Sequence, residues 1–469
     1  MITILYITGD KLKKNDVVIL EIEDITNLGF GVGKVDGAVV FVSSAIPGDK
    51  VRVKIIKAAD SYYVGRVEEY ILKSCNRVND RCENLRCHSC TYKYMSYSEE
   101  LLHKVSNVRA GFVKEGLADV MIEAVTPSPR LTEYRNKAQY PVSRDKNGEY
   151  VIGFYAPKSH TVCEASVCPM APKIFTAILE NLKTVFKKYS LSVYDEKSGE
   201  GLLRHVYLRR SEELGEVLVT LVINGSSLPH AGQIVEDIRR GFPKICGILL
   251  NVNKKNTNVI LGERFITLFG RDYITDTLAG VKLKITADSF YQVNHGTATL
   301  IYEEARRLAA LEKSDTLLDL YCGAGSIGLS MANDCAELIG IEIVDKAVEC
   351  AVHNAVENHI TNARFYTGDA KNTELFLANA ERALGRKITP DVIILDPPRA
   401  GSSRELIDFI EKLSPKRVVY ISCNPLTLAR DMKIFREKGY SSSSVKLYDM
   451  FPMTGHVESV VCLKRQIQQ

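Results

Sequence analysis

Several common features are scarce or missing in this sequence. It has no tryptophan, so any side chain that stacks on a nucleic-acid base must be tyrosine, phenylalanine, histidine or arginine. It has no apolar run close to the ~18 residues that cross a membrane. Residues 1–10 are apolar but have no basic leader and no clear cleavage site, so we expect no signal peptide, no membrane partner and a cytoplasmic protein. The net charge of +4 is too small to indicate a nucleic-acid partner by itself.

What the chain contains fits a soluble protein with more than one core. At about 150 residues per domain, a length of 469 residues suggests about three domains. Hydrophobic residues make up 45% and charged residues 25%, which are ordinary proportions for a globular protein. Twelve cysteines without a secretion signal do not fit a disulfide framework. For the cysteines that cluster, metal binding or catalysis is the better interpretation.

The N-terminal part of the chain has the pattern of a small β-barrel. Strand candidates alternate with turns that contain glycine, the strands at 17–22, 39–42 and 51–56 and the turns at 27–33 and 47–49. In the last strand, apolar and basic residues alternate as they do on a half-buried strand. Short strands within about 60 residues suggest a barrel of the OB type, a common RNA-binding module. A β-domain with another role is the alternative, because fold alone does not fix function.

The rest of the chain divides into a helical start, a mixed middle and an alternating end. Ser96 and Glu99 have the spacing of a capping box, and apolar residues then repeat at helical spacing up to Gly116. Residues 130–275 are mixed, which predicts an α+β region. Residues 280–469 alternate strands and helices, which predicts an α/β domain with a parallel sheet.

A glycine-rich loop joins a buried strand to a helix in the alternating region. The strand at 316–321 runs into Gly323, Gly325 and Gly328, the G-x-G-x-x-G spacing that lets a backbone approach a ligand closely. The next strand ends in Glu342, which can accept hydrogen bonds from ribose, and a third leads to Asp369, which can accept one from an adenine amino group. The pattern fits a dinucleotide or S-adenosylmethionine. Asp319 either orients the loop or the methionine part of such a cofactor, or is structural.

Two later strands end in residues that are candidates for catalysis. The strand at 392–395 ends in Asp396 and the one at 418–422 in Cys423, so both lie at the ligand edge of a parallel sheet. A thiolate that adds to carbon 6 of a uracil makes carbon 5 nucleophilic, and a base must later remove the carbon-5 proton. Cys423 is the candidate nucleophile and Glu458 the candidate base. The alternatives are a buried core cysteine and an exposed surface carboxylate.

The cysteines near residue 85 have the spacing of a metal site. Cys82, Cys87 and Cys90 follow a C-x4-C-x2-C pattern, which suits three corners of an iron–sulfur cluster or three ligands of zinc. Cys168, before a proline, is the candidate fourth ligand. The rivals for that place are Cys75, Cys163 and His88. The cysteines that we expect in the core are Cys246, Cys322, Cys335, Cys350 and Cys462. Reduced cysteines without a metal are the remaining alternative.

Together these motifs resemble the family of bacterial 23S rRNA uracil-5-methyltransferases over nearly the whole chain. The resemblance is specific because DPPR, SCNP and HVE occur together, at 396–399, 422–425 and 456–458. It implies three parts, namely an N-terminal TRAM barrel, a central iron–sulfur and RNA-binding domain, and a Rossmann-like methyltransferase domain. Their bounds would be 1–72 for the first, 73–95 with 127–280 for the second, and 96–126 with 281–469 for the third. The helix from about 96 to 126 would pack with the methyltransferase fold.

The resemblance also implies a role for each candidate site residue. The residues implied to contact S-adenosylmethionine are Gln292, Tyr321, Glu342, Asp369 and Asp396, and Phe290 would lie near the RNA base. Cys423 would be the nucleophile and Glu458 the base. A [4Fe-4S] cluster would be held by Cys82, Cys87, Cys90 and Cys168. Here the chain departs from the family. The spacing between the first two cysteines, Cys82 and Cys87, is one residue shorter, and His88-Ser89 replaces a glycine pair.

The substrate implied by the resemblance is 23S rRNA, with tRNA as the alternative and a monomer as the expected state. Two stretches, 130–144 and 204–210, interleave basic and aromatic residues and are candidates for RNA contact. A solvated strand face is the alternative for each. Two other classes of protein stay open on the residues alone. The glycine loop also fits an NAD-dependent dehydrogenase, and the whole chain fits a non-catalytic RNA-binding protein.

Overall fold

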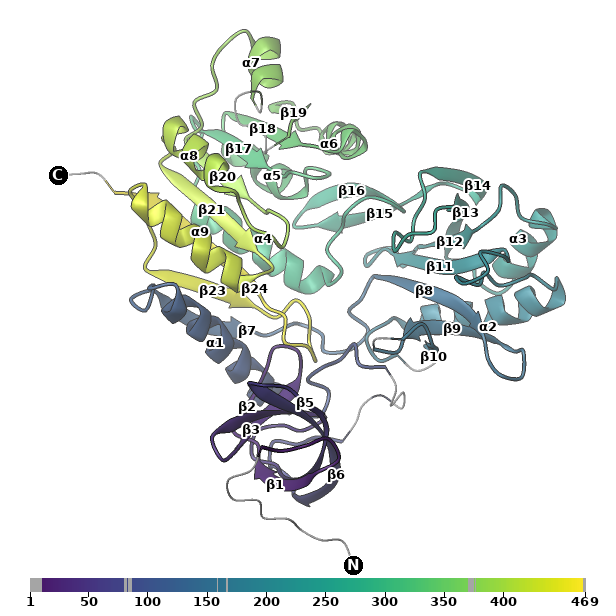
Figure 1. Ribbon diagram of the computed structural model, residues 1–469. Helices are drawn as coiled ribbons and strands as arrows, with labels where there is room; N and C mark the ends of the chain where they lie inside the picture. Colours follow the sequence, from purple (N-terminus) through teal and green to yellow (C-terminus); the bar gives the residue numbers. More distant parts are fainter. Residues whose placement is uncertain are drawn as a thin grey trace, which may run out of the picture.

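The computed structural model describes residues 11–79, 82, 87–157, 159–165, 168–369, 375 and 377–466. Figure 1 shows three units, which are a purple barrel, a central unit in blue to teal, and a larger unit in green and yellow that also includes a blue helix. The α/β class with an N-terminal β-barrel, predicted from the sequence, is confirmed. Among the helices in the described ranges, none is long and apolar enough to cross a membrane.

The barrel is one curled sheet with the strand order β1-β5-β6-β4-β3-β2. Its strands are β1 (Val17–Glu21), β2 (Asp24–Ile25), β3 (Phe30–Val35), β4 (Ala38–Ser43), β5 (Lys50–Ala58) and β6 (Tyr62–Leu72). The turn expected at 27–33 is correct only in its first half, because Gly31 and Gly33 lie inside β3. A Cβ atom on Gly33 would lie 2.7 Å from the carbonyl oxygen of Glu21. Glycine therefore lets β3 approach β1 and close the barrel.

The central unit is a mixed sheet with helices on one face. Its strand order is β10-β9-β8-β11-β12-β13-β14. The elements are β8 (Lys137–Arg144), β9 (Tyr150–Tyr155), β10 (Val162–Glu164), α2 (Lys173–Lys188), β11 (Leu203–Arg210), β12 (Val217–Ile223), α3 (Ala231–Arg239), β13 (Ile245–Val252) and β14 (Arg264–Gly270). β12 is buried along its whole length, because α2 and α3 cover one face and the hairpin β15 (Tyr273–Leu278) and β16 (Val281–Thr286) packs on the other.

The largest unit has the strand order β19-β18-β17-β20-β21-β24-β23-β7. Its strands are β7 (Met121–Thr126), β17 (Thr316–Leu320), β18 (Glu337–Glu342), β19 (Ala363–Thr367), β20 (Val392–Leu395), β21 (Arg417–Ser422), β22 (Tyr440–Ser441), β23 (Ser444–Tyr448) and β24 (Glu458–Arg465). β17 to β21 run parallel, and β24 lies antiparallel between β21 and β23. The buried, nearly continuous apolar strands are typical of a parallel sheet with both faces covered.

Helices cover both faces of this sheet (Figure 1). They are α1 (Tyr97–Lys114), α4 (His295–Ala309), α5 (Ser326–Met331), a short 3-10 turn (Ala332–Asp334), α6 (Asp345–Glu357), α7 (Ala378–Leu384), α8 (Arg404–Leu413) and α9 (Pro425–Glu437). One apolar core forms under α4, α5 and α6, and a second forms under α1, α7, α8 and α9. Alternate residues of β17 serve the two cores, with Leu317 in the first and Leu318 in the second.

The segment before the central unit joins the large sheet. β7 pairs in parallel with β23, and α1 packs beside α9. The helix expected from about 96 to 126 is wrong in its second half, because it ends at Lys114 and Gly116 follows with a φ of 81°. Ser96 is the N-cap residue as predicted, but its side chain makes no capping bond. Glu99 instead accepts a hydrogen bond from Asn76 Nδ2 at 2.9 Å.

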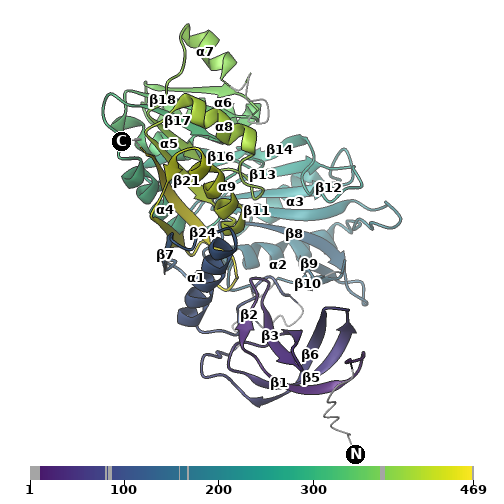
Figure 2. The ribbon, with the colours of Figure 1, turned by 60° about the vertical axis from the view of Figure 1, so that its left-hand side comes forward.

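The barrel lies below both other units in Figures 1 and 2. It touches the large unit closely at Gly455, where a Cβ atom would lie 2.1 Å from the carbonyl oxygen of Asn27. This contact brings the loop between β2 and β3 to the loop that precedes β24. The barrel is therefore positioned beside the residues that follow β21.

Candidate active site

The candidate catalytic side chains meet at one edge of the large sheet. Asp396 follows β20 and Cys423 follows β21, and the carboxyl ends of parallel strands share an edge. β24 runs in the opposite direction, so its first residue, Glu458, reaches the same edge. The register pairs Ser422 with Ser459, which places Cys423 beside Glu458. The strand pattern thus brings together three side chains that lie far apart in the sequence.

These three groups act on one another electrostatically. Burial raises the pKa of Asp396 to about 7. Burial, helped by the charge of Asp396, raises the pKa of Glu458 to about 8. Burial and the charges of Glu458 and Asp396 raise the pKa of the Cys423 thiol to about 11. A carboxylate with a pKa near the working pH suits proton transfer.

The alternatives considered for these residues are not what the structure has. Glu458 is 5% exposed, so it is not a surface carboxylate. Cys423 is half-buried and lines a cleft of about 520 Å³, so it is not a core residue. The cleft lies between the β2–β3 part of the barrel, α1 and the loops that follow β20 and β21.

Arg399 is a site residue that sequence reasoning passed over. It is exposed, lines the same cleft as Cys423, and lowers the pKa of both Cys423 and Glu458 by its positive charge. The last letter of the DPPR motif was the signal that could have identified it. The arginine supplies positive charge beside Cys423, where Glu458 and Asp396 raise the pKa of the thiol by their negative charge.

The glycine loop and its acidic partners form a second group. Gly323 and Gly325 have φ angles of 55° and 78°, in the region that favours glycine. Glu342 accepts hydrogen bonds from Gly323 N at 3.1 Å and Val344 N at 3.0 Å, so its carboxylate joins the loop to the end of β18. Tyr321 precedes the loop with a φ of 64°, a strained value for a non-glycine residue. Strain of this kind is typical of ligand sites.

Asp369 belongs to the same group. Burial raises the pKa of Tyr321 to about 12, and the charges of Asp369 and Glu342 add to that rise. Asp369 itself is exposed just after β19. The three residues expected at the nucleoside end of a cofactor therefore lie together at the carboxyl ends of β17, β18 and β19.

Asp319 connects the two groups. It is fully buried in β17, and its Oδ2 accepts a hydrogen bond from Gly328 N at 2.9 Å. Burial raises its pKa to about 7, with smaller contributions from Asp396 and Glu342. This geometry favours the interpretation that Asp319 orients the glycine loop.

Tyr302 is a second residue that sequence reasoning missed. It lies buried on α4, and its hydroxyl is 2.8 Å from Ser326 Oγ in the glycine loop. Burial raises its pKa, and the charges of Asp396, Asp319 and Glu458 add to the effect. No motif marks this tyrosine, since it reads as an ordinary core position of an amphipathic helix.

The segment 286–294 carries the remaining candidates. Phe290 is 67% exposed, which leaves its ring free for a contact with a ligand. Gln292 is half-buried, and its carbonyl oxygen accepts a hydrogen bond from Asn136 Nδ2 at 2.8 Å. Arg209 fixes the start of the segment by donating to the carbonyl oxygens of Thr286 at 2.7 Å and of Ser289 at 2.8 Å.

The prediction of an RNA-contacting stretch at 204–210 is wrong. Arg204, His205, Tyr207 and Arg209 are all at most 8% exposed. β11 lies inside the central sheet between β8 and β12, so both of its faces are covered. The charged groups serve the protein itself, and Arg204, for example, donates to the carbonyl oxygen of Asn253 at 2.8 Å.

The stretch at 130–144 is divided between interior and surface. Tyr134 and Tyr140 are buried, so they do not stack on RNA. Lys137 is half-buried, and burial together with Arg209 and Arg135 lowers its pKa to about 8. Such a lysine is a site where a phosphate would relieve repulsion between like charges.

The four cysteines of the predicted metal site lie near one another. Burial raises the pKa of the Cys90 thiol to about 12, and the charges of Cys168, Cys87 and Cys82 add to that rise. Of the two rival cysteines, one is exposed and the other is buried in β10 (Cys75 and Cys163, respectively). The structure describes Cys87 and His88, and residues 83–86 lie outside the described residues.

Comparison with known proteins identifies the family. A family model described as tRNA (Uracil-5-)-methyltransferase matches residues 96–466, and a TRAM domain model matches residues 11–67. An RNA methyltransferase of Halalkalibacterium halodurans, described as uncharacterized, is 38% identical over 97% of this chain and 98% of its own. An uncharacterized RNA methyltransferase of Listeria innocua is 38% identical over 96% of this chain and 98% of its own.

A solved structure agrees with these matches. It is the tRNA (uracil-54, C5)-methyltransferase of Pyrococcus abyssi in complex with S-adenosyl-L-homocysteine. Its TM-score is 0.76 at 26% identity, covering 95% of this chain and 100% of the archaeal one. The chain therefore belongs to the tRNA (uracil-5-)-methyltransferase family of RNA-modifying enzymes, with a TRAM domain ahead of its catalytic part.

Proposed function

We propose that this protein methylates carbon 5 of a uridine in 23S rRNA, with Cys423 as the nucleophile and Glu458 as the base. The observation that carries the proposal is the meeting of Cys423, Glu458 and Asp396 beside one cleft. Membership of the family sets aside the dehydrogenase interpretation of the glycine loop. A buried glutamate next to a cysteine at a cleft is also not what a purely RNA-binding protein needs.

The chemistry divides into steps that these residues can perform. The Cys423 thiolate adds to carbon 6 of the uracil, and the ring electrons move to carbon 5 as an enolate. Carbon 5 then takes a methyl group from S-adenosylmethionine, which supplies it in activated form. Glu458 removes the proton from carbon 5, the C5=C6 bond re-forms, and the thiolate leaves carbon 6. Arg399 favours the thiolate at the start, because its charge lowers the pKa of Cys423.

The residues at the strand ends fit S-adenosylmethionine. Glu342 has carboxylate lone pairs for ribose hydroxyls, and Asp369 can accept from the adenine amino group. Tyr321 offers a ring beside them, and the resemblance adds Gln292 and Asp396 as contacts of the cofactor. The S-adenosyl-L-homocysteine complex of the Pyrococcus abyssi relative supports this choice of cofactor.

The substrate is the finer part of the proposal. The DPPR, SCNP and HVE motifs, the TRAM barrel and the four cysteines together resemble the enzymes that act on 23S rRNA. tRNA is the second candidate, because both the matched family description and the archaeal relative refer to tRNA. In either RNA the target base must leave its stack to reach Cys423. We propose that 1–72, 73–95 with 127–280, and 96–126 with 281–469 act as barrel, central and catalytic units of a monomer.

We also propose a [4Fe-4S] cluster on Cys82, Cys87, Cys90 and Cys168. A single zinc ion holds each sulfur at about 2.3 Å, so its ligands converge tightly. Within the described residues, no three histidine, cysteine, aspartate or glutamate side chains converge on one ion position. The charges of Cys82 and Cys87 nevertheless raise the pKa of Cys90 and Cys168, so the four thiols lie in one neighbourhood, and the resemblance favours the cluster over zinc. A structural role suits the cluster, since this methyl transfer needs no electron.

Metal content tests the ligand set independently of activity. Protein prepared without oxygen should contain iron and sulfide, and Cys90→Ala or Cys168→Ala should lose both. Cys75→Ala and Cys163→Ala are the matched controls and should retain them. If iron is retained in Cys168→Ala but lost in Cys75→Ala, then Cys75 is the fourth ligand in place of Cys168.

The function is tested by methyl transfer from labelled S-adenosylmethionine to unmodified 23S rRNA and tRNA transcripts. Label in 23S rRNA alone is the expected result, and label in tRNA alone would keep the mechanism and change the substrate. Cys423→Ala should abolish both turnover and the covalent adduct with 5-fluorouridine RNA. An adduct that persists in Cys423→Ala would remove that residue as nucleophile, and no label in either RNA would contradict the proposal.

A further inference from the structure

The loop 449–457 connects β23 to β24 and ends at the proposed base. The last pair of the hairpin joins Tyr448 to Glu458, so Asp449 begins the loop directly beside the base. Glu458 thus has a strand on one side and this loop on the other. The orientation of its carboxylate depends on how the loop is held.

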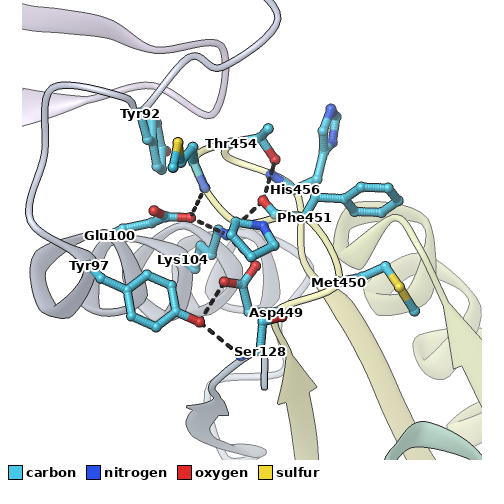
Figure 3. Close-up of polar contacts among 12 residues, drawn as sticks. Tyr92, Tyr97, Glu100, Lys104, Ser128, Asp449, Met450, Phe451, Thr454 and His456 are labelled. Carbon is cyan, nitrogen blue, oxygen red and sulfur yellow. Dashed lines mark hydrogen bonds and ion pairs between the residues drawn. The ribbon is translucent and has the colours of Figure 1, made fainter. Parts of the chain in front are cut away.

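A buried ionic network holds the start of the loop (Figure 3). Lys104 on α1 has no exposed side-chain surface, and neither does Asp449. The Lys104 ammonium donates to Asp449 Oδ1 at 2.7 Å, to Glu100 Oε1 at 2.6 Å and to the carbonyl oxygen of Phe451 at 3.3 Å. All three N–H donors of the lysine are therefore used. Tyr97 adds a fourth bond by donating to Asp449 Oδ2 at 2.7 Å.

The middle of the loop is held by contacts from other units. Met453 N donates to Glu100 Oε1 at 2.8 Å, and Met453 has a φ of 67°. The carbonyl oxygen of Met453 accepts from Tyr92 N at 2.9 Å, and the Tyr92 hydroxyl donates to the barrel at the carbonyl oxygen of Thr26. From the central unit, the Tyr134 hydroxyl donates to the carbonyl oxygen of Pro452 at 3.3 Å. Figure 3 shows Tyr92 and Lys104 on opposite sides of this turn.

Burying one ammonium with two carboxylates is a poor way to gain stability. Desolvation offsets much of the attraction, and apolar residues of the same size often do as well. What a fully bonded ionic network supplies is a fixed geometry. The network fixes the Asp449 carboxylate and the nearby backbone, at the point where the loop leaves the Tyr448–Glu458 pair. Its position next to the base connects that geometry to catalysis.

We propose that Lys104, Asp449 and Glu100 are positioning residues that hold Glu458 for the proton-abstraction step. This inference rests on the proposed roles of Cys423 and Glu458. It separates the steps of the reaction, because the bonds of the network join α1 to the loop 449–457, whereas nucleophilic attack and methyl transfer use β21 and the glycine loop. Lys104 also lines the cleft beside Cys423, and Asp449→Asn leaves that lysine in place. A loosened loop should therefore slow the loss of the carbon-5 proton more than the transfer of the methyl group. The methylated RNA then stays attached to Cys423.

The test follows both steps in one turnover. RNA labelled with tritium at carbon 5 of uridine reports proton loss, and a labelled methyl group reports transfer. For Asp449→Asn we expect tritium release to fall about tenfold or more, part of the 10²–10⁴-fold contribution of a general base. Methyl transfer should fall far less, and a covalent protein–RNA species should accumulate on a denaturing gel with ordinary RNA. Affinities for RNA and S-adenosylmethionine should stay within about twofold, since neither site is altered.

Controls separate this inference from the proposed function. Asp315→Asn is the matched control, because Asp315 is 1% exposed and paired with Lys416, but it lies before β17 at the opposite end of the sheet. It should lower stability without accumulating the covalent species. Glu458→Gln should accumulate that species strongly, and the unaltered protein should be trapped by 5-fluorouridine RNA. If both of those controls fail, the proposed function is wrong, and the network is not the cause.

A milder variant covers the case in which Asp449→Asn does not fold. Tyr97→Phe removes one hydrogen bond from Asp449 and leaves both charges paired with Lys104. It should still raise the covalent species by a few-fold relative to the unaltered protein. Equal losses of methyl transfer and proton release in a folded variant, without the covalent species, would overturn the inference.

Discussion

The protein has buried carboxylates in two neighbouring places, and the cation that opposes their raised pKa is positioned differently in each. At the cleft, Glu458 has a pKa raised to about 8 by burial, and the cation that opposes this rise, Arg399, is exposed. Beside α1, burial raises the pKa of Glu100 to about 7, but Lys104 opposes the rise through a direct bond at 2.6 Å. The first arrangement leaves a carboxylate ready to take a proton. The second uses a bonded ammonium to fix a shape, and the two are joined by one loop.

The largest expected effect comes from removing the proton acceptor at the cleft. Glu458→Gln should lower turnover by about 10²–10⁴-fold, the usual contribution of a general base. The methyl group should still be transferred, so the RNA should remain bound to Cys423. Single-turnover kinetics with a denaturing gel measures both. Turnover close to that of the unaltered enzyme would show that another group removes the proton.

The matching change beside α1 should act on stability. Lys104→Met leaves two buried carboxylates without their cation and should lower the free energy of unfolding by about 3–5 kcal/mol. Lys255→Met is the surface control, because the Lys255–Glu263 pair is 72% and 88% exposed. That control should change the free energy of unfolding little, because solvent screens an exposed pair. Denaturant unfolding measures the two changes in the free energy of unfolding. Equal changes in the two variants would show that the buried network stabilises the protein no more than the surface pair does.

The pH dependence of the rate sharpens the contrast. Glu458 must be ionised to accept a proton, and its pKa is raised to about 8. Measured from the covalent intermediate, in which the Cys423 thiolate has already reacted, the rate of proton loss should therefore rise with pH up to about 8, by at most about tenfold per unit, and then level off. In Glu458→Gln this dependence should disappear. A rate that is flat between pH 6 and about 8 in the unaltered enzyme would contradict the assignment.

The smallest expected effect comes from the exposed cation. Arg399→Gln removes a charge that lowers the pKa of Cys423 and Glu458, so the pH profile should move to higher pH. At neutral pH the rate should fall by only a few-fold, because solvent screens an exposed charge. Arg399→Lys should restore most of the rate. A shift to lower pH in Arg399→Gln would have the wrong sign for this explanation.

Sequence patterns predicted the active site better than they predicted its surroundings. Asp396 and Cys423 could be brought together in advance, because each ends a parallel strand and such ends share an edge. Glu458 could be named as a candidate base, but its place could not be predicted, because only the register of an antiparallel strand brings it to that edge. The cofactor group followed from the glycine loop and the acidic residues after the next two strands.

The errors have physical causes. Basic and aromatic residues alternate in β11 as on an exposed strand, but its place inside the sheet buries both faces. Lys104 reads as a solvent-facing helix residue, and nothing local reveals Asp449, which lies 345 positions away in the chain. The helical repeat ends at Gly116, and only the resemblance carried the expected helix on to about residue 126. The segment 121–126 pairs with β23 and is therefore a strand.

The turn at Met453 has a consequence for how the enzyme matures. It is bonded to α1 through Glu100, to the stretch after the barrel through Tyr92, and its side chain packs with Tyr134 and Met170 beside Cys90 and Cys168. All of these neighbours precede the turn in the sequence, so they are synthesised before it. The turn makes its full set of contacts only when all of them have docked, so the geometry beside Glu458 depends on the assembly of the whole molecule.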